Sequence, residues 1–416
     1  MREMKDSGIE WVGTIPAHWS TMPNKYVMRK IKVINPTYNG ENILSLTVNG
    51  VIVRDLEAGG KMPSSFDGYQ ILYKGNLLMC LFDYDVTPRC IGLIKDSGVS
   101  SPAYSQFVLQ RGNDAAYFYY YYLMVDHTKA LLHRAKNLRH SFTEEQLGAI
   151  KVTVPPIAEQ ERIADFLDSQ CSQIDAISAD IQKEIETLEQ YKRSLVFEAI
   201  SKGINGEKTA NASSDIWKEI PQSWKLVDIK YLFEIVKRIA GREGYNILSV
   251  TQKGLKVKDI SGNQGQIAEN YSGYQFVFPS DYVMNHMDLL TGWIDCSDQF
   301  GVTSPDYRVF RLRDKTQNDT EYYKYVMQCC YMCRIFYSLG QGVSTLGRWR
   351  LQTSAFMNFK VPVPPLHEQK EIARYLNDKC KEIELSIEQK RKQLELLSSY
   401  KKSLIYEYVT GKKEVI

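Results

Sequence analysis

Three of the eight cysteines in this 416-residue chain stand close together, at Cys329, Cys330 and Cys333. Closely spaced cysteines are typical of structural zinc sites, which need four protein ligands. No second pair of Cys or His follows at a ligand spacing, and the remaining cysteines are scattered. We therefore interpret the three residues as the reduced, buried face of a helix. We expect neither a metal site nor a disulfide framework.

A second kind of chemistry is indicated where basic and amide side chains gather in loops. Arg and Lys read guanine edges in DNA, Asn and Gln read adenine edges, and all of them also hold phosphates. The DNA-contact candidates in the first half of the chain are Asn49, Arg54, Arg89, Lys136, Asn137, Arg139 and His140. Those in the second half are Gln252, Lys253, Lys256, Gln341, Ser344, Thr345, Arg348 and Arg350. The alternative for each residue is an ordinary solvated loop.

Catalytic motifs are weak by comparison. Asn35-Pro36-Thr37-Tyr38 is similar to the Asn-Pro-Pro-Tyr motif with which adenine methyltransferases hold a flipped base, but the second proline is missing. No strand–Gly-x-Gly–helix cofactor loop accompanies it, so we interpret the segment as a turn. Gly340-Gln341-Gly342 follows a predicted helix rather than a strand, and we do not expect it to cradle a phosphate. The chain is predicted to be non-catalytic.

Six consecutive aromatic residues, at positions 117–122, have the side chains needed to stack on bases. On a helix their rings point in all directions, and residues 322–325 form a similar tyrosine-rich segment. We therefore predict that these rings pack in the core. His127, His133 and His286 have no partner at metal spacing and are expected to be structural or at the surface.

The composition, with 44% hydrophobic and 24% charged residues, is that of a globular protein long enough for two to four domains. No apolar run is long enough to span a membrane, and the charged start, Met1-Arg2-Glu3-Met4-Lys5-Asp6, does not fit a signal peptide. We expect a cytoplasmic protein with no membrane contact. Because the net charge is only +3, a DNA-binding role predicts a partner that shares the phosphate contacts.

An internal repeat organises the chain. The segment Val154-Pro155-Pro156-Ile157-Ala158-Glu159-Gln160 returns 209 residues later as Val363-Pro364-Pro365-Leu366-His367-Glu368-Gln369. At the same offset, Tyr191-Lys192-Arg193-Ser194-Leu195 matches Tyr400-Lys401-Lys402-Ser403-Leu404. The segments upstream of each copy match more loosely. The chain is thus a variable module, a similar segment, a second variable module and a second similar segment.

Each similar segment predicts one long helix that begins after the Pro-Pro pair, the first spanning residues 157–201. Apolar residues recur there at steps of three, four and seven, the spacing of one helix face. A helix of about 45 residues measures roughly 65–70 Å at 1.5 Å per residue. Such a helix with a narrow apolar seam needs a partner helix. We predict that the two copies pair as an antiparallel coiled coil.

The variable modules are predicted to be mixed α/β. Short β-branched runs at 50–53 and 107–109 indicate strands, and residues 115–135 and 321–339 indicate amphipathic helices. The fold class is therefore α/β (α+β), with two mixed modules, two long helices and approximate twofold symmetry. We call residues 1–154 the first head and 205–362 the second head, with a polar linker at 205–215. The helical spacers are residues 155–204 and 363–416.

This layout predicts that the long helices set a fixed distance between the two heads. Two heads on one face of DNA must sit about one helical turn apart, roughly 34–36 Å, and a pair of long helices can fix such a separation. Because the heads differ in sequence, each would read a different half of an asymmetric site. The gap between the halves would be set by the helices.

The motif Val-Pro-Pro-x-x-Glu-Gln-x-x-Ile-Ala-x-x-Leu occurs twice, at 154–167 and 363–376. With the Trp-containing start and the divergent heads, it resembles the specificity subunits of type I restriction–modification enzymes across nearly the whole chain. In the first head, Ala135-Lys136-Asn137-Leu138 stands where the second has Gly342-Val343-Ser344-Thr345, a less typical loop.

The resemblance implies a fold of two target-recognition domains and two conserved helices. It implies assembly with two methyltransferase subunits, which carry S-adenosylmethionine, and optional assembly with motor-nuclease subunits that use ATP and Mg²⁺. No cofactor is then expected in this chain. The predicted partner-binding residues are those of the repeated motif: Glu159, Gln160, Ile163, Leu167, Glu368, Gln369, Ile372 and Leu376.

Two other interpretations remain open. The long helices also fit a coiled-coil scaffold whose heads bind proteins instead of DNA. An enzyme with a concealed active site is disfavoured by the lack of a convincing catalytic constellation. Methylation that depends on a partner and occurs at one gapped motif would distinguish the DNA-specificity hypothesis from both of these interpretations.

Overall fold

The computed structural model describes residues 2–57, 63–135, 140–212, 214–258, 270–342 and 349–415. The chain forms two units: unit 1 comprises residues 1–182 and 391–416, and unit 2 comprises residues 183–390. Each unit therefore contains one head and a part of each long helix. Each compact unit combines a head with the parts of the helices that it contacts, whereas the predicted boundaries at 154, 204 and 362 separate heads from helices along the sequence. Those boundaries therefore stay a prediction. No described helix is long and apolar enough to cross a membrane.

Unit 1 is built on a four-stranded antiparallel sheet in the order β4-β11-β8-β9. These strands are Met28–Ile31, Ser105–Leu109, Leu77–Met79 and Ile91–Leu93. Four antiparallel pairs surround it: β1 (Met4–Asp6) with β2 (Thr14–Pro16), β3 (Ser20–Pro23) with β12 (Lys151–Val154), β5 (Leu44–Thr47) with β6 (Gly50–Val53), and β7 (Gln70–Leu72) with β10 (Gly98–Ser100). The helices of the head are α1 (Ala115–His127) and α2 (Glu144–Ala149), with 3-10 turns at Asn24–Tyr26 and Leu132–Arg134.

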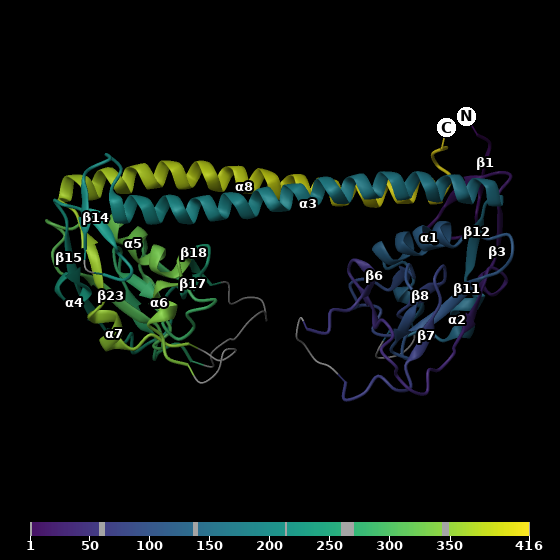
Figure 1. Ribbon diagram of the computed structural model, residues 1–416, viewed down its shortest axis with the longest axis horizontal. Coiled ribbons are helices and arrows are strands. Elements are labelled where there is room, and N and C mark those ends of the chain that lie inside the picture. The colour runs from purple at the N-terminus through teal and green to yellow at the C-terminus, as the bar shows by residue number, and fades with distance from the viewer. Residues whose placement is uncertain are drawn as a thin grey trace. The chain divides into compact units, whose positions relative to one another are not determined.

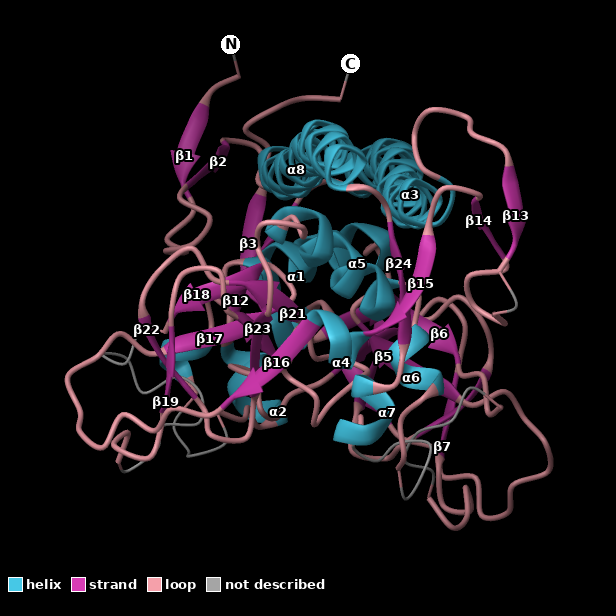
Figure 2. Cartoon of the chain, turned by 90° about the vertical axis from the view of Figure 1, so that its left-hand side faces the viewer, coloured by secondary structure: helices cyan, strands magenta, loops and turns pink. Residues whose placement is uncertain are grey.

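Unit 2 repeats this arrangement strand for strand. Its sheet has the order β16-β23-β20-β21, formed by Phe233–Val236, Arg308–Leu312, Tyr282–Met284 and Ile294–Cys296. The flanking pairs are β13 (Thr209–Asn211) with β14 (Glu219–Pro221), β15 (Lys225–Asp228) with β24 (Lys360–Val363), β17 (Leu248–Thr251) with β18 (Gly254–Val257), and β19 (Gln275–Val277) with β22 (Gly301–Thr303). Its short helices are α4 (Ile229–Leu232), α5 (Thr320–Met332), α6 (Ile335–Ser338) and α7 (Thr353–Met357). The internal repeat is thus a repeat of topology (Figures 1 and 2).

Three local predictions were wrong. Helix α1 ends at His127 rather than at 135, because Lys129 takes a positive φ of 50° that no right-handed helix accommodates. The predicted helix 321–339 is split into α5 and α6, and Arg334 between them has a φ of 55°. The segment predicted as a polar linker, 205–215, contains strand β13, which pairs with β14 as β1 pairs with β2.

The two long helices have the predicted extent: α3 spans Ile157–Lys202 and α8 spans Leu366–Val409. Each begins directly after a Pro-Pro pair, where the missing N–H of proline is not needed. Each is followed by a glycine with positive φ, Gly203 at 74° and Gly411 at 69°, which is the usual left-handed helix stop. A Cβ on Gly411 would also lie 2.5 Å from Cδ of Pro16, so only glycine fits there.

Within each unit the two long helices run antiparallel. In unit 1 the rings of Phe166 and Tyr408 lie 4.4 Å apart, and Lys401 Nζ lies 2.5 Å from a carboxylate oxygen of Asp175. The partner numbers fall along α8 as they rise along α3. In unit 2, Lys390 pairs with Glu184 and Lys192 Nζ lies 2.5 Å from Glu384, again in descending order. The predicted antiparallel pairing is confirmed in both units.

The core of each unit joins the head to the long helices. In unit 1, Tyr117, Phe118 and Tyr121 of α1 are fully buried in one cluster with Leu167 of α3 and Ile405 of α8. Figure 1 shows α1 directly beneath the long helices in this unit. In unit 2, Figure 2 shows α5 in the corresponding place, where Tyr322 and Tyr323 are fully buried. The prediction that these aromatic runs pack in the core is confirmed except at Tyr119, which is half-buried. Of the three cysteines predicted to form one buried helix face, Cys329 and Cys330 on α5 are buried, whereas Cys333 directly follows the helix and is half-buried.

Candidate functional site

A buried tryptophan fastens the first head to α3. The indole N–H of Trp19, at the start of β3, donates to Glu159 Oε2 at 3.0 Å, and His18 Nε2 lies 2.6 Å from the other carboxylate oxygen. Trp19 is 1% exposed, so its N–H has to find a partner inside the protein. A hydrogen bond to an ionised carboxylate is roughly twice as strong as one between neutral groups.

The next residue of α3 makes a second fastening. Gln160 is fully buried; its side-chain amide donates to the carbonyl of Pro155 at 2.8 Å, and its side-chain oxygen accepts the backbone N–H of Asp114 at 2.8 Å. Asp114 is the N-cap of α1 and accepts from the backbone N–H of Tyr117. One glutamine therefore ties the first turn of α3 to the beginning of α1. We call the contacts of Glu159 and Gln160 the head clamp of unit 1.

Unit 2 carries the same clamp. The indole N–H of Trp224 donates to Glu368 Oε2 at 2.7 Å, and the side-chain oxygen of Gln369 accepts the backbone N–H of Asp319, the N-cap of α5, at 2.8 Å. The Gln369 side-chain amide donates to the carbonyl of Pro364 at 2.9 Å. The repeated Glu-Gln pair is thus explained by a repeated structural task.

The structure gives an intramolecular role to all eight residues predicted to bind a partner. Glu159, Gln160, Glu368 and Gln369 form the two head clamps, while Ile163, Leu167, Ile372 and Leu376 are buried in the cores beneath them, at 5% exposure or less. Their side chains face the chain's own heads. A direct contact with a partner stays a prediction for them.

The clamp predicts a pH dependence of stability. Burial alone would raise the pKa of Glu159, but hydrogen bonds from Trp19 and His18, together with the charge of Arg2, hold the pKa below its ordinary value. A carboxylate with a lowered pKa stabilises the fold above its unfolded pKa of about 4.3 and loses that contribution as the pH falls through the folded value. We expect Glu159→Gln to flatten the decline of the unfolding free energy of unit 1 below about pH 4.3. Urea titrations between pH 3 and 6 measure this, and a decline as steep as that of the wild type would contradict it.

The predicted DNA contacts of the first head fall at three places. Asn49 is exposed in the turn between β5 and β6, and Arg54 follows β6. Arg89 is committed within the head: its guanidinium donates to the carbonyls of Val48 and Ile91 and to the hydroxyl of Tyr119. His140 has a positive φ, and its Nδ1 lies 3.0 Å from Asp85. The predicted contacts Lys136, Asn137 and Arg139 lie outside the described residues.

The predicted contacts of the second head fall at two places. Gln252 and Lys253 form the exposed turn between β17 and β18, which corresponds to the Asn49 turn, and Lys256 is exposed on β18. Gln341 and Arg350 are joined by two backbone hydrogen bonds of 2.9 and 3.0 Å, which close the base of the loop between them. The predicted contacts Ser344, Thr345 and Arg348, within that loop, lie outside the described residues. The structure therefore sets a hairpin turn and a loop base, but no single cluster, as the candidate interface of this head.

Comparison with protein families agrees with this duplicated architecture. The model described as "Type I restriction modification DNA specificity domain" matches residues 65–187 and 221–396, one segment in each repeat. The chain belongs to this family. The resemblance seen in the sequence is thereby confirmed.

Two curated relatives of this specificity-domain chain come from Methanocaldococcus jannaschii. The type I restriction enzyme MjaVIII specificity subunit is 27% identical over 285 residues, which cover 64% of this chain and 63% of that protein. The putative type I restriction enzyme MjaX specificity subunit is 27% identical over 305 residues, covering 69% and 64%. The matched part spans less than two thirds of the length of either relative. A chain from a structure described as the basis of complex assembly and conformational transition of the type I R-M system aligns with a TM-score of 0.65 and 13% identity over 96% of this chain and 99% of that one, which shows a shared fold.

Sequence reasoning missed two features of this specificity-domain chain. Arg308 on β23 is 5% exposed, lies over the ring of Phe356 and donates to the carbonyl of Leu351 and to Thr353, just beyond the loop that Gln341 and Arg350 close. Burial lowers the pKa of Arg308 to about 10, so it stays charged at neutral pH. The second feature is a groove in unit 1 with a cavity volume of about 600 Å³, lined by the first head and both long helices. Neither has a local sequence signal, because both depend on residues far apart in the chain.

Proposed function

We propose that this chain is the specificity subunit of a type I restriction–modification complex. Each head reads one half of an asymmetric, bipartite site in double-stranded DNA. The long helices fix the gap between the halves and dock two methyltransferase subunits. The observation that carries the proposal is a duplicated framework that presents unlike side chains. Both units have the same strand pairing and the same tryptophan–glutamate and glutamine–backbone contacts in their head clamps.

The unlike side chains stand at matching places in the two heads. The β5–β6 turn presents Asn49, whereas the corresponding β17–β18 turn presents Gln252 and Lys253. Amide side chains pair with adenine edges and lysine with guanine edges. A framework held constant while its exposed polar groups vary is suited to two different half-sites. Which of the predicted contacts read bases and which hold phosphates is left to mutagenesis.

Chemistry in this proposal belongs to the partners. Two methyltransferase subunits carry S-adenosylmethionine and methylate adenine, and motor-nuclease subunits use ATP and Mg²⁺ to cleave unmodified DNA. This chain contributes no catalytic residue. Its net charge of +3 supports an arrangement in which the partners supply part of the phosphate contacts.

We infer that the methyltransferase subunits contact the outer face of the long helices. The residues of the repeated motif are already engaged in the head clamps. Tyr191 on α3 and Tyr400 on α8 stand at the same position of the two copies and are 54% and 55% exposed. Other large apolar residues that are exposed on the long helices, such as Leu396, are not matched by an exposed apolar residue in the other copy. A tyrosine that is exposed twice in the same setting fits two copies of one partner, since tyrosine is enriched among energetically dominant contacts.

Removing these tyrosines should change the stoichiometry of the complex. We expect Tyr400→Ala and Tyr191→Ala each to weaken one of the two methyltransferase sites by roughly tenfold or more, the equivalent of about 1.4 kcal/mol. The double variant should lose both copies at concentrations where the wild type holds two. Native mass spectrometry of the purified complex measures this directly. Leu396→Ala, which removes an unmatched exposed side chain, is the control and should keep two copies.

The function is tested by mapping methylated adenines in a genome with and without the gene for this chain, in a cell that supplies the methyltransferase. We expect methylation at one motif made of two unlike parts separated by a fixed gap, and its loss when the gene is deleted. Methylation that persists unchanged without the gene would refute the proposal. Isolation of protein partners with no DNA-dependent activity would favour a scaffold instead.

A further inference from the structure

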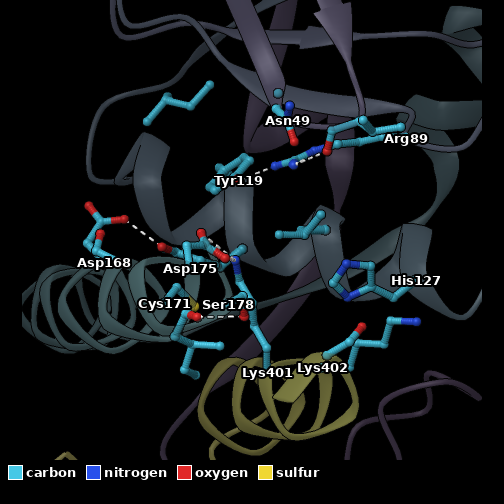
Figure 3. A pocket seen from close by; sticks show the side chains of 18 of the residues that line it. Asn49, Arg89, Tyr119, His127, Asp168, Cys171, Asp175, Ser178, Lys401 and Lys402 are labelled. Carbon is cyan, nitrogen blue, oxygen red and sulfur yellow. Dashed lines mark hydrogen bonds and ion pairs between the residues drawn. The ribbon is translucent and has the colours of Figure 1, made fainter. Parts of the chain in front are cut away.

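The groove of unit 1 lies between the first head and the two long helices of that unit. Its wall on the head comprises the β5–β6 turn with Asn49, the Arg89 segment, and Tyr119, Leu123 and His127 of α1. The opposite wall is formed by residues 168–178 of α3 and 394–402 of α8. Figure 3 shows Asn49 and Arg89 on one side and Lys401 and Lys402 on the other, with His127 beside Lys402. The cavity volume of about 600 Å³ lies within the range of small-molecule sites.

The charges that line this groove are mainly positive. Arg89, Lys95, Lys401 and Lys402 face two carboxylates, those of Asp168 and Asp175. Lys401 and Asp175 neutralise each other at 2.5 and 2.7 Å, and Asp168 accepts the hydroxyl of Tyr120 at 2.6 Å. Among the residues that the structure describes, no side chain pairs with Lys95 or Lys402. These two lysines and Arg89 leave the groove with uncompensated positive charge.

Two polar groups of the groove lining have hydrogen-bonding capacity that the described residues do not use. Three bonds from the Arg89 guanidinium fix its position and leave two of its five N–H groups available. The Nδ1 of His127 is buried and has no hydrogen-bond partner within the described part of the chain. Buried polar atoms are normally satisfied, so this Nδ1 lies behind the groove surface with its hydrogen-bonding capacity unused.

The lining also includes an apolar and aromatic part beside uncharged polar residues such as Asn49 and Ser178. Leu93, Leu123, Ile174 and Leu394 line the groove beside the ring of Tyr119. A phosphate ion alone would leave most of this surface and volume empty. The lining instead fits a ligand with an anionic end and a flat or apolar body.

We propose that this groove binds a mononucleotide unit, with its phosphate near Arg89, Lys95 and Lys402 and its base along the Tyr119 wall. The unit comes either from a free nucleotide or from a single nucleic-acid strand. This goes beyond the reading of duplex DNA by the heads, and the groove shares Asn49 and Arg89 with the predicted duplex contacts of the first head. The residues that form the α1 wall of this groove differ in the second half of the molecule. In unit 2, the positions of Tyr119, Leu123 and His127 are taken by Lys324, which pairs with Glu321, by Gln328, which donates to Asp295, and by Met332.

The experiment uses the full chain at low ionic strength, titrated by calorimetry with AMP, adenosine, inorganic phosphate and a single-stranded tetranucleotide. We expect AMP to bind at least about tenfold more tightly than adenosine or phosphate, since each lacks one half of the complementarity. Lys402→Gln should weaken AMP binding by about tenfold. Arg193→Gln, the matched change on α3 in unit 2, should leave it within about twofold.

His127 provides a second readout that a purely structural role of Lys402 would not move. Burial, Lys402, Arg89 and Lys401 together lower the pKa of His127 to about 4, against the opposing charge of Asp126 on its own helix. A bound phosphate supplies negative charge, so saturation with AMP should raise this pKa, measured from the ring-proton NMR signals. In Lys402→Gln, AMP at the same concentration should raise it less.

Each outcome of these measurements either supports or overturns the proposed nucleotide site. Binding of the tetranucleotide but not of AMP, lost in Lys402→Gln, supports the site and assigns its source to a nucleic-acid strand. Absence of binding by both ligands, equal loss in Lys402→Gln and Arg193→Gln, or an unmoved His127 signal at saturation would overturn the proposal.

Discussion

Replacing residues 1–154 with the first head of another specificity subunit is expected to change one half of the methylated motif and to leave the other half and the gap unchanged. The physical reason is that each head packs into the hydrophobic core of its own unit. New side chains in the first head therefore do not disturb the second head, which contains β16–β24. A mismatched base pair costs about 1–3 kcal/mol, so loss of a half-site of three or more base pairs lowers binding to the old site by roughly a hundredfold or more. Mapping of methylated adenines measures the outcome.

The exchange requires that the head clamp be preserved. The donor head must supply a tryptophan at position 19 for Glu159 and an N-cap backbone at position 114 for Gln160, because both contacts join the head to α3. The reciprocal exchange of residues 205–362 is the matched control and should change the opposite half. A change of both halves, or of the gap, after a single exchange would contradict the modular reading of DNA.

The second large effect is expected at Trp19. Trp19→Ala removes a fully buried ring and leaves Glu159 without its indole donor, so we expect unit 1 to lose about 3–5 kcal/mol of stability. The loss should appear as faster hydrogen exchange in β3, β12 and the first turns of α3. Trp224→Ala should produce the same change in β15, β24 and the first turns of α8, since Trp224 makes the equivalent contact with Glu368.

A milder substitution separates the ring from its hydrogen bond. Trp19→Phe keeps an aromatic side chain but removes the N–H donor to Glu159, and we expect a loss of about 1–3 kcal/mol. A loss in Trp19→Phe as large as that in Trp19→Ala would place the energy in the hydrogen bond rather than in burial. No loss in Trp19→Ala would show that the clamp does not hold the first head.

The duplication of the chain and its two long helices were predictable because short, local sequence patterns encode them. The Pro-Pro pairs and the 3.6-residue spacing of apolar side chains each act over a few residues, so the extents of α3 and α8 followed from them. The aromatic runs at 117–122 and 322–325 were predicted to be buried for the same reason, since rings on every side of a helix leave no polar face for solvent.

Errors arose where a single backbone conformation decided the outcome. Lys129 and Arg334 adopt positive φ values, which are uncommon for residues with a Cβ, and so α1 and α5 ended earlier than their apolar patterns did. Strand β13 was read as linker because its residues, Thr209–Asn211, are polar, and only its pairing with β14 makes it a strand.

By itself the sequence determined the duplication, the fold class and the family. Repeated motifs and helix periodicity can be recognised without knowing which distant residues are in contact. Only the tertiary structure decided what the repeated Glu-Gln pair does, since Trp19 and Asp114 reach Glu159 and Gln160 from 140 and 46 residues away. The same holds for the groove of unit 1, where residues 89–95 of the head, α3 and α8 bring together charges that no local pattern connects. Local interactions leave a trace in sequence spacing, whereas burial and the pairing of distant polar groups are set by how the elements pack.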